Sequence, residues 1–579
     1  MISLVNFLFN FFNPNRIIIQ TFFLSFIFFS TNSYSVEKIY KNDYLSNYFS
    51  GIISLNNQDY ESSLNFLKRL DELENNHVSY SRRYLSSLVN TSNISEAVKY
   101  SLLLKKKKIN YFQSDLIIIS KLIKNNQFDL AQKALIDLKK NNEKLPLQRL
   151  LFQTILNWVE IENNKLTFNE SKKKFDGMDT RFKNITKIQE VFLNCYFDTP
   201  DAKISYENLI NTKTTDFTRY TFFYVNYLLR KNLKKESVLI LDKSLTKVPR
   251  NLLLNQLKID LEKNKIKKLN DKFNCRNVSN IIAELFYVTA NALSTQSLYS
   301  ASNYYINISK YLNTKFVSYD SLVAENFYYS GKISKAKMIY SKMSKFGEIF
   351  NWHSSKQIAA IIIEDEKNSK KALDVVNKTF ARLAKPNLYQ IYDYAAFLKN
   401  NEKYDEAVKY YSDVISVITK EHELYAKALD GRGISYERLN FWDKAERDFL
   451  ESLRVKPNQA YVLNYLAYSW IEKGIKINQS LDMLKKADRI RSEDGYITDS
   501  LGWALFKLKK YSKAKTYLQK AIQIMPADPV INDHFADSLW MNGNKLQARY
   551  YWNYVLNLED TDKELREKIS DKIVFGLKN

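Results

Sequence analysis

The sequence predicts an all-α protein, a solenoid in which antiparallel helix pairs stack one on another. Three observations lead to this prediction. The chain has 579 residues, which is too long for one ordinary globular core. It contains only 11 glycines and 8 prolines, so it offers little material for the tight turns of a β-protein. Small residues also recur at intervals of about 34 positions, the length of two helices and their turns.

One small residue in each predicted second helix marks the repeat. In the C-terminal half the steps between these residues are 35, 36, 35, 38, 35, 34 and 34, along Ala301, Ala336, Ala372, Ala407, Ala445, Ser480, Ala514 and Ala548. The N-terminal half holds fragments of the same period at Ser63, Ala97, Ala131, Ser171, Ala202 and Ser237, and residues 250–285 show no clear anchor. Small residues let paired helices approach closely, and each pair leaves an apolar face that only the next pair can bury.

Three units carry a second small residue in the first helix of the pair, so that the predicted structural positions are Gly433 with Ala445, Gly502 with Ala514, and Ala536 with Ala548. Large residues lie between these positions, and Pro457 and Pro526 end second helices. This pattern resembles the tetratricopeptide repeat (TPR). The resemblance covers most of residues 40–560 and is specific over about 386–560. It implies a right-handed superhelical solenoid.

The resemblance also implies a domain organisation. Residues 36–285 are expected to form divergent TPR-like helical repeats, residues 286–559 the TPR solenoid, and residues 560–579 a C-terminal capping helix. The segments DGYITDSLGWALFKLKKYSKAKTYLQKAIQIMPADP and VINDHFADSLWMNGNKLQARYYW resemble exported TPR proteins of Gram-negative, alphaproteobacterial-like bacteria. That similarity implies an envelope location and a function in protein interaction.

The N-terminus, residues 1–35, has the order of a secretory signal peptide. Arg16 precedes the uncharged apolar run IIIQTFFLSFIFFS, and a small, polar exit follows, with a cleavage site expected near Val36. A second apolar stretch at residues 2–12 supports the alternative of an uncleaved membrane anchor. Either alternative predicts an exported protein, periplasmic or membrane-anchored through its N-terminus and facing the periplasm.

The charge and the cysteines leave alternatives open. The formal net charge is +24, which favours association with anionic membrane surfaces or reflects lysines spread over the whole chain. The aromatic residues are not interleaved with arginines, so no nucleic-acid partner is expected. Cys195 and Cys275 lie 80 positions apart. They pair in an oxidising compartment or remain isolated buried thiols.

The sequence contains no pattern typical of catalysis. The four histidines are His77, His353, His422 and His534, and no two are spaced to bind a metal from one helix. Phosphate-loop, nucleophile-elbow and dinucleotide patterns are absent from the sequence. We therefore expect no enzyme, no cofactor and no metal.

The first helix of each pair is expected to line a concave groove. Four polar residues, the inner row, occupy the same register position in the last four repeats: Asp430, Asn464, Asp499 and Asp533. Around them stand Tyr461, Tyr465, Tyr468, Tyr496, Trp503, Phe506, His534, Asp537 and Trp540. Acceptor oxygens beside aromatic rings suit an extended peptide, because they can accept its backbone N–H groups or its basic side chains. Alternatively, the aspartates cap or solvate helices and the rings are ordinary core.

We therefore expect a non-catalytic protein-interaction scaffold of the bacterial envelope that binds a peptide or protein partner. The alternatives are a membrane-anchored adaptor, or an accessory subunit of an envelope, cell-wall or polysaccharide enzyme complex.

Overall fold

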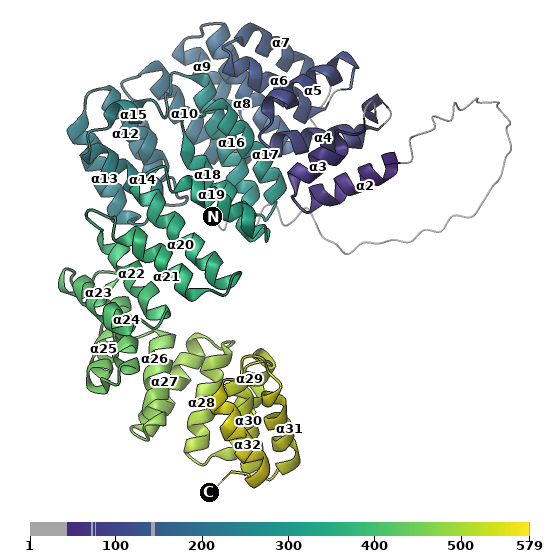
Figure 1. The fold of residues 1–579 in the computed structure, drawn as a ribbon. Coiled ribbons are helices and arrows are strands. Elements are labelled where there is room, and N and C mark those ends of the chain that lie inside the picture. The colour runs from purple at the N-terminus through teal and green to yellow at the C-terminus, as the bar shows by residue number, and fades with distance from the viewer. Residues whose placement is uncertain (1–42, 71–72, 76, 110, 140–144, 578–579) are drawn as a thin grey trace, which may run out of the picture. The chain divides into compact units, whose positions relative to one another are not determined.

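The computed structural model describes residues 43–577 except 71–72, 76, 110 and 140–144. The predicted signal peptide or anchor, residues 1–35, lies outside the described residues. Within the described ranges the chain is helical, and no strand occurs there (Figure 1). The described residues divide into two compact units, the first ending at Thr379 and the second beginning at Phe380.

The helices of the first unit follow one another as antiparallel neighbours. They are α2 (Asp43–Asn56), α3 (Tyr60–Leu67), α4 (Val78–Asn90), α5 (Ile94–Lys106), α6 (Phe112–Lys124), α7 (Phe128–Lys139), α8 (Pro146–Asn163), α9 (Phe168–Asp176), α10 (Lys183–Phe197), α11 (Ala202–Ile210), α12 (Tyr220–Arg230), α13 (Lys234–Lys247), α14 (Leu252–Glu262), α15 (Ile266–Asn270), α16 (Val278–Ser294), α17 (Tyr299–Leu312), α18 (Asp320–Tyr329), α19 (Ile333–Met343), α20 (Glu348–Glu364) and α21 (Ser369–Phe380). Short 3-10 turns lie at Leu73–Asn75, Thr180–Phe182 and Val317–Tyr319.

The second unit continues the pattern and ends in an unpaired helix. Its helices are α22 (Leu388–Asn400), α23 (Tyr404–Ser416), α24 (Tyr425–Arg438), α25 (Trp442–Val455), α26 (Ala460–Glu472), α27 (Ile477–Ile490), α28 (Gly495–Lys507), α29 (Tyr511–Ile524), α30 (Pro529–Met541), α31 (Lys545–Leu556) and α32 (Lys563–Phe575). Aspartates cap the first helices α28 and α30 and the closing helix α32, where their side chains accept hydrogen bonds from backbone N–H groups that the helix leaves unbonded.

The turn inside each helix pair repeats more regularly than the sequence does. One residue with positive φ ends the first helix of every pair from α2–α3 to α30–α31: Gln58, Ser92, Asn126, Lys165, Asp198, Asn232, Asn264, Ser297, Gly331, Lys367, Glu402, Asn440, Gly474, Lys509 and Gly543. In the left-handed conformation the chain turns back, so that the N–H groups after the helix donate hydrogen bonds to its last carbonyls. The N-terminal half is therefore built from the same helix-pair unit as the C-terminal half.

The small residues lie where the sequence placed them, with one exception. Ala336, Ala445 and Ala514 are fully buried, but Ala301 is exposed and the buried residue of that pair is Ser302. The prediction at Ala301 was therefore wrong by one position. The hydroxyl of Ser302 accepts a hydrogen bond of 2.8 Å from Asn326 Nδ2 on the next pair, so a serine satisfies both the packing and a buried amide.

Close helix approach explains the two predicted glycines. A Cβ atom on Gly433 would lie 2.8 Å from the ring of Phe449, and one on Gly502 would lie 2.6 Å from Leu518 Cγ. Both distances are below van der Waals contact, so a larger side chain would push the two helices of the pair apart.

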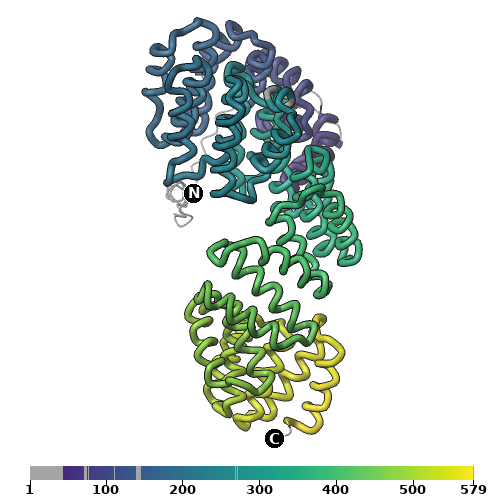
Figure 2. The backbone as a smooth tube through the Cα atoms, turned by 90° about the vertical axis from the view of Figure 1, so that its left-hand side faces the viewer, coloured from purple at the N-terminus to yellow at the C-terminus, as the bar shows by residue number. Residues whose placement is uncertain are grey.

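The first unit folds back on itself. Helices α16 and α17, teal in both views, pack against α4, α6 and α8, which run from purple to blue (Figures 1 and 2). Tyr304 OH donates to the carbonyl of Gln113 at 3.1 Å, and Lys335 Nζ lies 2.7 Å from Glu61 Oε2. One apolar core consequently runs through the unit from Tyr60 to Ile361, and α16 and α17 cover the surface that earlier pairs would otherwise leave open.

Cys195 and Cys275 form a disulfide, with their Cα atoms 5.9 Å apart. The bond joins α10 to the segment between α15 and α16. Helix α15 has only five residues, so the second helix of this pair is cut short. In this pair the repeat position that a small residue usually occupies is taken by the buried Leu269. The sequence therefore shows no small residue that marks the repeat in residues 250–285.

The compact units divide between Thr379 and Phe380, whereas the sequence placed a boundary between residues 285 and 286. The two boundaries mark different things. The register of small residues becomes regular near residue 286, but α16 and α17 share the N-terminal core because they pack on helices far earlier in the chain. No helix among the described residues has the length and apolar character needed to cross a bilayer.

Candidate functional site

The first helices of successive pairs in the second unit lie side by side. Helix α28 packs against α26 on one side and against α30 on the other. A tyrosine in the first turn reaches forward to the start of the next first helix: Tyr389 OH donates to Glu423 at 2.8 Å, and Tyr461 OH donates to Asp494 at 3.0 Å. These bonds link consecutive repeats along the edge of the predicted groove.

The thirteen predicted groove residues fall into three groups by burial. Tyr461 and Tyr496 are exposed, at 53% and 55%. Six others are partly buried: Asp430, Asn464, Tyr465, Tyr468, Phe506 and Trp540. The remaining five are buried: Asp499, Trp503, Asp533, His534 and Asp537.

The C-terminal end of the inner row is neutralised within the protein. Asp499 contacts His534, whose Nδ1 lies 3.0 Å from Asp499 Oδ1, and the His534 ring stacks on Trp503 with centroids 4.0 Å apart. Lys572 of α32 donates to Asp533 at 2.7 Å and to Asp537 at 2.9 Å. These acidic side chains already have cationic or N–H partners within the protein, so they contribute to the stability of the fold.

The pKa values in this cluster follow from burial and mutual repulsion. Burial together with the Asp533 carboxylate raises the pKa of Asp537 to about 6 despite the ammonium of Lys572. Burial lowers the pKa of His534, but the carboxylates of Asp499, Asp533 and Asp537 together outweigh burial and the net shift is upward. The cluster therefore favours a protonated His534 facing Asp499.

The other two members of the inner row have no such partner. Burial raises the pKa of Asp430 to about 6, with Lys399 opposing from a distance. No hydrogen bond to the Asp430 carboxylate occurs among the described residues. The side-chain oxygen of Asn464 is buried and accepts no hydrogen bond there. Buried acceptors without donors are uncommon because each forfeits its bonds to water.

The aromatic rings of the predicted groove are held by carboxylates and by one another. Tyr465 OH donates to Glu437 at 3.0 Å, and Trp503 Nε1 donates to Glu472 at 2.6 Å. Phe506 stacks on Trp503 at 4.8 Å. The rings are therefore held rigidly, and part of their area is inter-repeat core, as the alternative interpretation of the sequence proposed.

Sequence reasoning missed Lys572 as a member of the site. The sequence predicted a C-terminal capping helix over residues 560–579 but assigned no groove residue to it. Lys572 belongs to a helix that has no counterpart in the preceding repeats, so periodicity could not assign it an inward position. Its place in the last turn of α32, where lysines are favoured on any helix, did not indicate an inward position.

The region from residue 347 to residue 561 matches the sequence model of the tetratricopeptide repeat. These residues belong to the tetratricopeptide repeat family. Solenoids of this kind stack helix pairs into extended surfaces that bind other molecules. The TPR region begins at the start of α20 and ends just before α32, so it includes the whole inner row.

One curated relative is the TPR repeat-containing protein PA4667 of Pseudomonas aeruginosa. It is 27% identical over 132 residues, which cover 23% of this chain and 22% of that protein. The match thus spans about a fifth of the relative's length.

Solved TPR structures align with about a third of this chain. MamA from Desulfovibrio magneticus is 16% identical over 31% of this chain and all of its own, with a TM-score of 0.27. YrrB, described as a TPR protein with an unusual peptide-binding site, is 14% identical over 32% of this chain and 92% of its own, with a TM-score of 0.26. PilW, a type IV pilus biogenesis factor, is 20% identical over 33% of this chain and 88% of its own, with a TM-score of 0.29.

Among the described residues no group of three or more His, Cys, Asp and Glu side chains is placed to hold a metal ion. The site therefore offers acceptor oxygens, aromatic faces and one unpaired carboxylate. This chemistry suits recognition of donors and cations.

Proposed function

We propose that this protein is a non-catalytic scaffold that holds a partner protein through a basic peptide segment, bound along α24, α26 and α28. One observation carries the proposal. The inner row has four members, of which Asp499 and Asp533 are paired with donors of the same chain, whereas Asp430 and Asn464 are not. A ligand's donor would bind most favourably at these two unpaired acceptors, because no hydrogen bond within the described part of the protein has to be broken there.

The contacts of Lys572 support a cationic donor as the ligand of this row. Its ammonium contacts both Asp533 oxygens, at 2.7 and 2.8 Å. Asp430 occupies the equivalent register position on α24, so a lysine or arginine from a partner would meet the same type of carboxylate there. Tyr461 and Tyr496, both more than half exposed, supply faces against which the stem of that side chain or the peptide backbone can pack.

Site-specific photocrosslinking tests the location of the partner. A photoreactive phenylalanine replaces Tyr461 or Tyr496 in the full-length protein, and Tyr550 on α31, also exposed, provides the matched control position. We expect one partner segment to be captured at the first two positions and not at the third. Equal capture at Tyr550, or none at Tyr461 and Tyr496, would exclude this face.

The captured segment, made as a synthetic peptide, tests the chemistry. Asp430→Asn should weaken binding about tenfold, because a charge-assisted hydrogen bond contributes roughly 1.5 kcal/mol or more. Asp482→Asn removes the same charge from the exposed face of α27 and should leave affinity unchanged. Equal weakening by both variants would reduce the effect to long-range charge and refute a specific contact at Asp430.

We further propose that the protein acts outside the cytoplasm, in the bacterial envelope. The Cys195–Cys275 disulfide supports this location, because structural disulfides persist in oxidising compartments and are rare in the cytosol. The apolar run at residues 17–30 supplies the export signal. Thiol labelling of protein denatured directly from cells should find both cysteines blocked; free thiols would argue against export.

A membrane-anchored adaptor is the second candidate, and one surface feature favours it. Leu45, Phe49 and Ile53 form a stripe on α2, four residues apart, and each is more than half exposed. Helix α2 is the first described helix after the apolar N-terminal run, so the stripe would lie near the membrane if that run is retained. N-terminal sequencing of the native protein decides: a start near Val36 indicates the soluble form, and a retained apolar run indicates the adaptor.

A further inference from the structure

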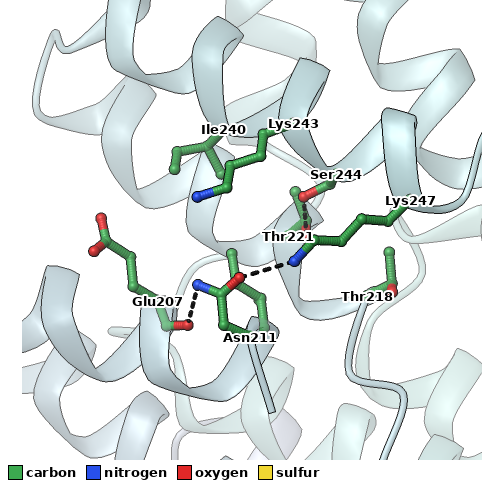
Figure 3. Close-up of a pocket in the computed structure, with 9 residues that line it drawn as sticks. Glu207, Asn211, Thr218, Thr221, Ile240, Lys243, Ser244 and Lys247 are labelled. Atoms are coloured by element: carbon green, nitrogen blue, oxygen red, sulfur yellow. Dashed lines mark hydrogen bonds between the residues drawn. The ribbon is translucent and has the colours of Figure 1, made fainter. Parts of the chain in front are cut away.

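A small polar pocket opens on the surface of the first unit, between α11, α12 and α13. Its volume is about 110 Å³, room for roughly three or four water molecules. Figure 3 shows Lys243 and Lys247, from the last two turns of α13, with their ammonium groups directed into the space beside Asn211 (Figure 3). The pocket is separate from the groove discussed above, which belongs to the second unit.

The floor of the pocket is a pair of buried hydroxyl groups. Thr221 Oγ1 and Ser244 Oγ lie 3.0 Å apart, and both residues are buried. Only one of their two hydroxyl hydrogens can lie between the two oxygens. The other has no protein acceptor among the described residues, so the floor presents one unused donor toward the pocket.

The walls carry two further donors that no carboxylate neutralises. Lys247 Nζ donates to the neutral side-chain oxygen of Asn211 at 2.9 Å. The Lys243 ammonium makes no hydrogen bond or ion pair within the part of the chain that the structure describes. The single acidic side chain in the lining, Glu207, accepts a hydrogen bond of 2.9 Å from Tyr224 OH. The lining of the pocket therefore carries a net positive charge and is rich in hydrogen-bond donors.

The helix dipole explains only part of this arrangement. Lysines near a helix C-terminus are favoured because they offset its partial negative charge. That effect does not require a cavity beneath them or buried hydroxyls on its floor. A ligand that satisfies all the unused groups together must be an acceptor with negative charge and oxygens pointing in several directions.

We propose that this pocket binds a single phosphate group, held by the ammonium groups of Lys243 and Lys247 and by a hydroxyl of the Thr221–Ser244 pair. A tetrahedral oxyanion reaches the floor and both walls at once, whereas the two oxygens of a planar carboxylate can meet only part of this set. The phosphate is either a free small-molecule group or the headgroup of a lipid, and the chemistry of recognition is the same for both.

Lysine acetylation of the full-length protein gives a local readout. Inorganic phosphate should slow acetylation of Lys243 and Lys247 at least threefold relative to chloride at equal ionic strength, measured by mass spectrometry. Lys235, an exposed lysine in the first turn of the same helix, is the internal control and should react at an unchanged rate. Equal protection of all three lysines, or of none, would overturn the proposal.

Two matched variants distinguish specific phosphate binding in the pocket from a general effect of positive charge on α13. Lys243→Ala should weaken phosphate binding at least fivefold in titration calorimetry, and Lys235→Ala, which removes the same charge from the other end of α13, should change it less than twofold. Equal effects of the two variants would overturn the proposal. Both lysines are exposed, so neither substitution should disturb folding.

Vesicles distinguish the two sources of phosphate. If the group is a lipid headgroup, phosphatidylglycerol vesicles should protect Lys243 and Lys247, and phosphatidylcholine vesicles should not. If it belongs to a soluble molecule, inorganic phosphate should protect the lysines and neither vesicle should.

Discussion

Lys572, on the helix that closes the second unit, places its ammonium nitrogen 2.7 Å from Asp533 Oδ1 and 2.9 Å from Asp537 Oδ1. The three groups are largely buried, and burial raises the pKa of Asp537. The closing helix therefore supplies a cation to an acidic pair that would otherwise face an open helix surface.

Loss of this cation should destabilise the end of the solenoid. Lys572→Met keeps the aliphatic stem but leaves two buried carboxylates without their cation, which should cost about 3 kcal/mol at neutral pH. Hydrogen exchange of the α30 amides measures the loss locally. Lys568→Met, which removes an exposed partner of Glu564, should cost less than about 0.5 kcal/mol. Similar losses for both variants would contradict the buried pairing.

The His534–Asp499 pair predicts a dependence on pH. Because the folded-state pKa of His534 lies above its ordinary 6.5, the pair's stabilisation is fully present below pH 6.5 and is lost as pH rises through the folded-state pKa. Asp537, with its pKa raised to about 6, acts in the same direction. The Asp537 contribution is lost between about pH 4 and 6, and the His534 contribution is lost above pH 6.5, so protection factors for α28 and α30 should fall as the pH rises through this range.

A variant tests whether His534 causes this dependence on pH. His534→Gln keeps a polar side chain that does not titrate, so the fall in protection should become smaller. Asp533 and Lys572 remain in the variant, so any residual slope belongs to the cluster around Asp537. An unchanged slope would show that His534 does not carry the effect.

The disulfide should stabilise the first unit alone. Cys195→Ala with Cys275→Ala opens a loop of 80 residues, which should cost about 2–4 kcal/mol. The second unit contains neither cysteine, so its exchange protection is the internal control. Equal loss in both units would indicate that they unfold as one.

A charge placed at a repeat position tests the register. Ala514 is fully buried between helices, so Ala514→Glu should overpack the site and bury a carboxylate, at a cost of about 3 kcal/mol or more. Gln519→Glu adds the same charge at an exposed position of α29 and should change the free energy of unfolding by less than about 0.5 kcal/mol. Thermal denaturation followed by circular dichroism measures both, and an unchanged midpoint for Ala514→Glu would refute the register.

Part of the candidate site was predictable from sequence. Asp430, Asn464, Asp499 and Asp533 do share one register position, because the repeat fixes which residues of each first helix are equivalent. The pairings were not predictable. His534 was expected beside the row, one repeat after Asp499, but its bond to Asp499 was not predicted, and Lys572 lies on a helix outside the repeat.

The sequence by itself determined the helix pairs and the register of the C-terminal half, because close helix contacts demand small side chains such as Ala445 and Ala514 wherever they recur. Only the tertiary structure decided the rest. The return of α16 and α17 onto α4, α6 and α8, the Cys195–Cys275 bond and the capture of Asp533 by Lys572 join residues with no periodic relation. Such contacts depend on where the chain travels in space, which local pattern does not encode.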